Sequence, residues 1–85
     1  MPTFPTIHLN GSDGETLLAQ YLAALKALQA AAAAHDAASP NARDYYVQGP
    51  DAYAAAREEH VNRAQRLASI TAELEAICIR VSDDV

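Results

Sequence analysis

The chain is poor in the residues that usually anchor a small fold. Its 85 residues include one cysteine, one phenylalanine, one methionine and no tryptophan. The single cysteine, Cys78, excludes an intrachain disulfide and leaves no Cys-x-x-Cys pair for zinc. Small scaffolds usually supplement their core with a disulfide, a metal or oligomerisation. Because a disulfide and a cysteine-based zinc site are excluded, self-association is the favoured way to supplement the core.

Basic residues are also scarce. Six Lys and Arg stand against eleven Asp and Glu, so the protein is acidic, with a formal charge of -5. Direct binding of nucleic acid needs a surplus of cations for the phosphates and is not expected. No stretch approaches the ~18 apolar residues of a membrane span, so no membrane contact is expected. The N-terminus lacks the basic and apolar regions of a secretory signal, which favours a soluble intracellular protein.

Motifs for catalysis are missing as well. The three glycines precede expected helices and form no phosphate-binding loop. Neighbouring acids such as Glu58 and Glu59 do not face each other on a helix. Cys78 has no evident histidine base, so it is interpreted as a small buried apolar residue. We expect a protein that is not an enzyme.

The three histidines are spread along the chain, one near the N-terminus and one in each helical run: His8, His35 and His60. No H-x-x-x-H or E-x-x-H spacing places two ligands on one helix face, so neither a metal site nor a cofactor is expected. His60 falls on an apolar stripe and is interpreted as a partly buried structural residue. His35 lies near a predicted helix C-terminus, where a protonated imidazole would favour the helix dipole.

Alanine and helical periodicity are abundant. Two prolines and an Asn-Gly turn predict an extended arm over residues 1–11. The S-x-x-E pattern of Ser12 and Glu15 predicts a capping box at the start of a helix over about 13–38. The larger apolar residues of this run recur at helical spacing: Leu17, Leu18, Tyr21, Leu22, Leu25 and Leu28.

A second helix is predicted over about 50–82, after an interhelix loop over 39–49 that begins at Ser39-Pro40. Gly49 is the expected N-cap, and Pro50 suits the first helical position. The apolar stripe of this helix approximates a coiled-coil heptad seam: Tyr53, Ala56, His60, Ala64, Leu67, Ile70, Leu74, Ile77 and Val81.

Two long helices joined by a short connection predict an all-α antiparallel two-helix hairpin, a single domain over residues 1–85. In this geometry one group of large side chains is expected to face another: Leu18, Tyr21 and Leu25 on the first helix, and Leu67, Ile70 and Leu74 on the second. A lone hairpin leaves part of each stripe in water. Two hairpins are therefore expected to pair into a homodimeric four-helix bundle, with docking on a different protein as the alternative.

The loop carries two adjacent tyrosines, Tyr45 and Tyr46. Tyrosine is enriched at interaction hot spots because it buries a large ring and keeps a polar hydroxyl. Adjacent side chains in an extended stretch point opposite ways, so one ring is expected to cover the alanine-rich end of the hairpin and the other to face solvent. With Arg43 and Tyr53, these tyrosines form the candidate partner-binding residues.

Three segments, "IHLNGS", "NARDYYVQGPDAY" and "AAREEH", together resemble small uncharacterised helical proteins of bacteriophage and prophage genomes. The resemblance carries no catalytic motif. It implies a phage or prophage interaction or assembly protein, located in the cytoplasm of the bacterial host or in the virion. The alternative that it implies is a small inhibitor that binds a host defence or regulatory protein.

Overall fold

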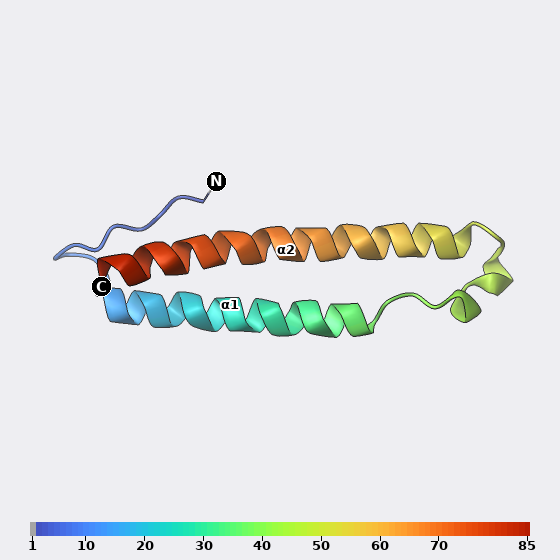
Figure 1. Cartoon of the computed structure of the whole chain (residues 1–85), viewed down its shortest axis with the longest axis horizontal. Helices are drawn as coiled ribbons and strands as arrows, with labels where there is room; N and C mark the ends of the chain where they lie inside the picture. Colours follow the sequence, from blue (N-terminus) through green and yellow to red (C-terminus); the bar gives the residue numbers. More distant parts are fainter. Residues whose placement is uncertain (1) are drawn as a thin grey trace.

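A computed structural model describes residues 2–85 as two long antiparallel helices joined by a loop (Figure 1). Helix α1 spans Gly14–Ala37 and helix α2 spans Ala52–Asp84. The loop contains two single turns of 3-10 helix, η1 over Ala42–Asp44 and η2 over Tyr46–Gln48. The described part of the chain contains no strand. The predicted all-α architecture of two helices packed on each other is confirmed.

Helix α1 is capped by Asp13. One carboxylate oxygen, Oδ1, accepts from the Thr16 amide at 2.9 Å, and Oδ2 accepts from the Thr16 hydroxyl at 2.7 Å. The capping box predicted for Ser12 and Glu15 is therefore wrong by one residue. A carboxylate accepts two hydrogen bonds and adds negative charge at the positive end of the helix dipole, so it outcompetes the serine hydroxyl.

The start of α2 also differs from its prediction. Gly49 has φ 114° and ψ 169°, a conformation that is nearly restricted to glycine, so it acts as the pivot of the loop and not as an N-cap. Pro50 and Asp51 form a turn before the helix, and Asp51 takes the N-cap position without a side-chain hydrogen bond. At its other end α2 continues two residues beyond the predicted limit, and Arg80 pairs there with Asp84 at 3.9 Å.

The start of α1 lies beside the last turns of α2. Leu18 shares one surface hollow with Cys78 and Ile79, which come after the residues that the sequence grouped opposite it. Helix α2 has 33 residues and α1 has 24, so the first turns of α2 extend past the end of α1 toward the loop (Figure 1).

The core is narrow and lies at the open end of the hairpin, where α1 begins and α2 ends. Its buried apolar residues among those described are Ile77, Cys78 and Val81, and Val81 has no exposed surface. No residue of α1 is buried, and its leucines are half-buried or exposed. Cys78 is buried as predicted. The hairpin alone therefore covers only part of its apolar surface.

One predicted core residue, Ile70, is 45% exposed. Thr71 takes the inward position beside it, and its hydroxyl donates to the Leu67 carbonyl at 2.8 Å. A threonine can bury its methyl group in a helix because its hydroxyl finds a partner one turn back. The heptad interpretation assigned Ile70 to the core from its spacing and its hydrophobicity and is wrong there.

The segment before α1 contains neither helix nor strand from residue 2 to residue 13. The Gly11 amide donates to the His8 carbonyl at 3.1 Å, which closes a turn beyond the end of the hairpin. From this turn the preceding residues run back along α2 (Figure 1). The Arg80 guanidinium lies 5.3 Å from the centroid of the Phe4 ring, a distance suited to a cation–π contact.

Helix α1 is long and apolar enough to cross a membrane, judged by length and composition only. The sequence analysis expected no stretch of this kind, and the composition of α1 differs from that expectation. None of this stretch is buried within the hairpin. Core helices of soluble proteins and signal sequences pass the same test, so the observation alone does not place the chain in a membrane.

We predict that Asp13→Ala lowers the midpoint of thermal unfolding and that the matched variant Ser12→Ala leaves it unchanged. Hydrogen bonds from the Thr16 amide and then from its hydroxyl lower the pKa of the Asp13 carboxyl from its ordinary 3.8. The capping contribution is therefore complete above pH 3.8 and is lost as the pH falls through the lowered folded value. Circular dichroism melts between pH 2 and pH 7 should show the unfolding midpoints of the wild type and of Asp13→Ala converge in acid. A difference between these midpoints that grows in acid would contradict the assignment of Asp13 as the cap.

Val81→Ala should cost about 1–3 kcal/mol of unfolding free energy, because it removes two methyl groups from a fully buried site. Urea unfolding of dilute protein measures this loss. Ile70→Ala, at an exposed position, should cost clearly less under the same conditions. The reverse order of the two losses would mean that the buried seam has been assigned to the wrong residues.

Candidate functional site

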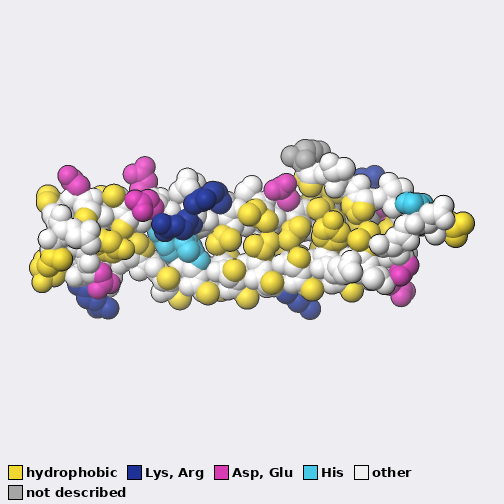
Figure 2. Space-filling view, turned by 180° about the vertical axis from the view of Figure 1, so that it is seen from behind, with side chains coloured by type: hydrophobic (Ala, Val, Ile, Leu, Met, Phe, Trp, Pro, Cys, Tyr) yellow, Lys and Arg dark blue, Asp and Glu magenta, His cyan; other side chains and the backbone are white. Residues whose placement is uncertain are grey.

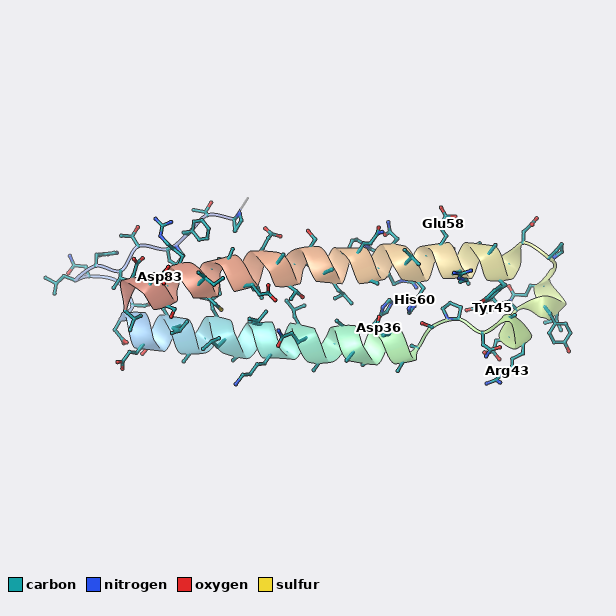
Figure 3. All side chains as sticks on the ribbon, viewed as in Figure 1. Asp36, Arg43, Tyr45, Glu58, His60 and Asp83 are labelled. Atoms are coloured by element: carbon teal, nitrogen blue, oxygen red, sulfur yellow. The ribbon has the colours of Figure 1, made fainter. Side chains whose placement is uncertain are left out.

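The two loop tyrosines have different surroundings. Tyr45 is half-buried, and its ring lies 6.5 Å from the Tyr53 ring, centroid to centroid, at an interplanar angle of 45° (Figure 3). Tyr46 is 75% exposed and its neighbour Val47 is 77% exposed. One ring thus packs against the first turn of α2, and the other is presented to solvent. Whether Tyr46 contacts a partner stays a prediction.

Arg43 is exposed in η1, and its side chain points away from the helices (Figure 3). Its backbone amide donates to Asn41 Oδ1 at 3.1 Å. Asn41, which the sequence interpretation overlooked, is the N-cap of η1. The four predicted partner-binding residues therefore comprise a tyrosine pair, Tyr45 and Tyr53, and two exposed residues, Arg43 and Tyr46. They all lie at the loop end of the hairpin.

Shallow apolar hollows occur on both flanks of the hairpin. The first, of about 500 Å³, is lined by His35, Arg63, Arg66, Leu67 and Ile70. The second, of about 330 Å³, is lined by Leu18, Leu22, Cys78, Ile79, Ser82 and Asp83. Ile70 and Ile79 are nine residues apart, which puts them about half a turn from each other around α2. We call these surfaces the Ile70 flank and the Ile79 flank.

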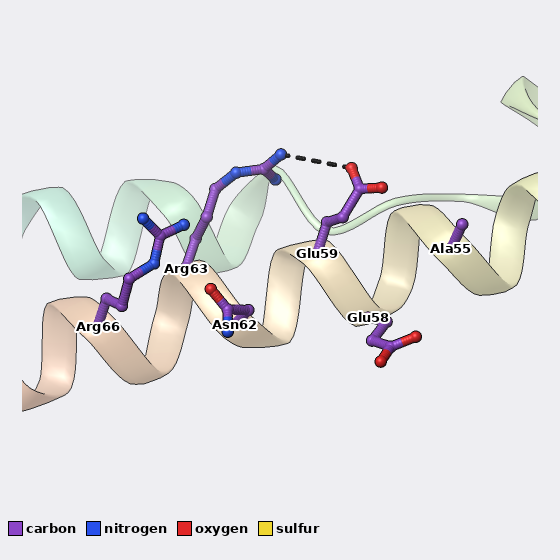
Figure 4. A pocket seen from close by; sticks show the side chains of 6 residues that line it. All are labelled: Ala55, Glu58, Glu59, Asn62, Arg63 and Arg66. Atoms are coloured by element: carbon purple, nitrogen blue, oxygen red, sulfur yellow. Dashed lines mark ion pairs between the residues drawn. The ribbon is translucent and has the colours of Figure 1, made fainter.

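A third hollow, of about 360 Å³, is polar and lies on α2 alone (Figure 4). It is lined by Ala55, Glu58, Glu59, Asn62, Arg63 and Arg66. The Arg63 guanidinium lies 3.7 Å from Glu59, and both side chains are more than half exposed. A solvated pair of this kind contributes little energy. Glu58 and Glu59 point to different sides of the helix, so the hollow brings no pair of carboxylates together.

Two histidines that the sequence treated separately meet between the helices. The imidazole rings of His35 and His60 stack with their centroids 3.9 Å apart and their planes at 8°. The histidine pair lies beside the arginines of α2 on one face of the molecule (Figure 2). Spacing on a single helix could not find this pair, because the two residues come from different helices. The signal lies in the register between the two helices.

Cys78 is an unsuitable nucleophile in this fold. Burial, and then the negative charge of Glu75, raise the pKa of its thiol above the ordinary value. The thiolate is the reactive form of cysteine, and both causes disfavour it. The packing of Cys78 in the core is sufficient to explain a cysteine at this position, and no chemical role is needed.

Comparison of the chain with protein-family models, with curated proteins and with solved structures found no match. The resemblance to phage proteins therefore remains an expectation from the sequence.

We predict that Tyr45→Ala and Tyr46→Ala have different effects. Tyr45→Ala should cost about 1–2 kcal/mol of stability, since a half-buried ring loses less than the ~3–5 kcal/mol of a fully buried one. Tyr46→Ala, at an exposed ring, should leave the unfolding midpoint unchanged. Chemical denaturation of the two single variants measures both effects, and an equal loss from both would contradict the assigned packing.

Proposed function

We propose that this chain is a non-enzymatic interaction protein that works through helix–helix packing, and that its first partner is a second copy of itself. The observation that carries the proposal is the small share of apolar surface that the hairpin covers. Only three apolar residues are buried in the described chain, while Ile70 and Ile79 remain 45% and 64% exposed.

The dimensions of the molecule support this proposal. The hairpin measures 61 × 21 × 17 Å, and its radius of gyration is 18.4 Å, against about 12 Å for a compact domain of this length. Its accessible surface is 6142 Å², whereas a compact monomer of 9.1 kDa has about 4,900 Å². The excess is about 1,200 Å² per chain. Two chains therefore carry about 2,400 Å² of excess, and a standard protein interface buries about 1,200–2,000 Å² in total, so pairing of two hairpins would remove more than half of the excess.

The proposed dimer is a four-helix bundle formed through the Ile70 flank. This flank has the larger apolar hollow, and Ile70 offers a large side chain that the hairpin does not use. The charges of α2 favour an antiparallel arrangement of the two copies, because its first half has a small positive net charge and its second half a negative one. The first half carries Arg57, Arg63 and Arg66 against Glu58 and Glu59, and the second half carries Glu73, Glu75, Asp83 and Asp84 against Arg80. Opposite charges at the rim of an interface fix its register.

In the proposed role the dimer is an interaction or assembly component of a phage or prophage. The second apolar surface, the Ile79 flank, remains available after the Ile70 flank is covered, so a larger phage or host protein can dock there. The alternative is a small inhibitor of a host protein that binds through the tip of the loop. The exposed pair Tyr46 and Val47 supports this alternative, since it forms an apolar anchor remote from the dimer flank.

We predict that the protein has a solution mass near twice 9.1 kDa at micromolar concentration. Ile70→Asp should reduce this mass to that of one chain, because it buries a charge in the proposed interface. Sedimentation equilibrium or light scattering after size exclusion measures the mass. Circular dichroism should report unchanged helix content, since Ile70 is exposed in the single hairpin.

Val47→Asp is the matched control, because it places the same charge at an exposed apolar position in the loop. It should leave the mass unchanged. A monomeric wild-type protein would contradict self-association. Dissociation by Ile79→Asp, but not by Ile70→Asp, would move the interface to the opposite flank.

A further inference from the structure

The stacked histidines belong to a three-residue cluster between the two helices. One nitrogen of His35, one nitrogen of His60 and a carboxylate oxygen of Asp36 all lie within 4.8 Å of one another. Asp36 and His60 come from opposite helices and point into the space between them (Figure 3). The cluster lies toward the loop end of the hairpin, far from the buried residues at its open end.

Both ring nitrogens of His35 are shielded from solvent and have no hydrogen-bond partner among the described residues. A buried polar group without a partner costs about 1–3 kcal/mol. In folded proteins such a group usually indicates a bound water or ion, or a functional role. The lone pair of the His35 imidazole is therefore available to a ligand, because no hydrogen bond within the described residues uses it.

The hydrogen bonds around His60 define which of its nitrogens carries the proton. The Ser39 hydroxyl donates its only proton to the Asp36 carbonyl at 2.9 Å, so it must accept from His60 Nε2 at 3.1 Å. Nδ1 of the neutral ring then holds the lone pair. Metal-binding histidines usually donate their other ring N–H to an oxygen in this way, which orients the imidazole.

We propose that His35, Asp36 and His60 bind a divalent transition-metal ion of the zinc type. Two imidazoles and one carboxylate are a donor set that suits zinc, with a fourth position left for water. Imidazole nitrogen disfavours magnesium and calcium, which take oxygen ligands. The site adjoins the proposed dimer interface, because His35 also lines the hollow of the Ile70 flank.

Binding requires a small rearrangement of the cluster. Zinc–ligand bonds of about 2.0–2.2 Å bring tetrahedral ligand atoms to about 3.3–3.6 Å from one another, against separations of up to 4.8 Å in this structure. A metal lies in the plane of each imidazole that binds it, so one ring has to turn out of the stack. The hollow of about 500 Å³ beside His35 gives that ring space to turn.

Two guanidinium groups limit the affinity of the site. Arg63 and Arg66 line the same hollow as His35, and their charges oppose a cation. Glu59 offsets part of this repulsion through its contact with Arg63 at 3.7 Å. We therefore expect a dissociation constant in the micromolar range, weaker than that of a preformed structural zinc site.

The ion would link α1 to α2 where packing is weakest. Its ligands come from both helices, whereas the neighbouring residues of α1 are mainly alanine. A ligand that binds only the folded hairpin raises its apparent stability. Zinc should therefore raise the unfolding midpoint of the protein, and magnesium should not.

The experiment uses the full chain without a histidine tag, titrated with zinc chloride in a calorimeter and melted with zinc or with magnesium. Wild-type protein should bind one zinc ion per chain. Asp36→Asn keeps the shape of an exposed side chain and should weaken binding at least tenfold. His60→Gln and His35→Gln should abolish binding, with folding of each variant checked by circular dichroism.

His8→Gln is the matched control, because His8 lies in the N-terminal segment outside the cluster. It should bind zinc as the wild-type protein does. Cobalt(II) should give the visible absorption of a tetrahedral site in the wild type and in this control only. No zinc binding up to millimolar concentration, equal loss in the His8 variant, or unchanged binding in Asp36→Asn would each overturn the proposal.

Discussion

The fold depends on how little apolar bulk two alanine-rich helices can bury between them. Alanine keeps the helices regular and lets them approach closely, but it contributes little area to a core. The few larger side chains that are fully removed from water, Ile77, Cys78 and Val81, lie together at the open end of the hairpin. Toward the loop, the contact between the helices depends on smaller residues and on the stacked imidazoles of His35 and His60. The proposed partner surfaces and the proposed metal site both follow from this uneven distribution.

The sequence was sufficient for the helices because their signals are local. Periodic leucines, the break at Pro40 and the acidic helix start depend on neighbours within a few residues, and the helices lie within two residues of their predicted limits. The errors occurred where two local options compete. Asp13 and Ser12 can both cap α1, and Ile70 and Thr71 can both face inward. Asp13 is the cap because its carboxylate accepts from the Thr16 amide, and Thr71 faces inward because its hydroxyl donates to the Leu67 carbonyl.

The candidate sites were less predictable because they depend on the register between the helices. The division of Tyr45 and Tyr46 into an inward and an outward ring needed only their adjacency in the loop. The meeting of His35 with His60 needed the offset of α1 against α2, which single-helix spacing does not contain. A site formed by residues of both helices can therefore be predicted only when the register between the two helices is known.

The greater length of α2 has a consequence for how the molecule opens. Its first turns have no part of α1 beside them, and the adjoining stretch of the hairpin is poor in buried side chains. Local unfolding requires the least free energy where few apolar contacts are lost. We therefore expect the two helices to separate first at the loop and last at Val81, where their buried contacts lie. Any ligand that bridges the helices near His60 would change the flexibility of the loop without touching its tyrosines.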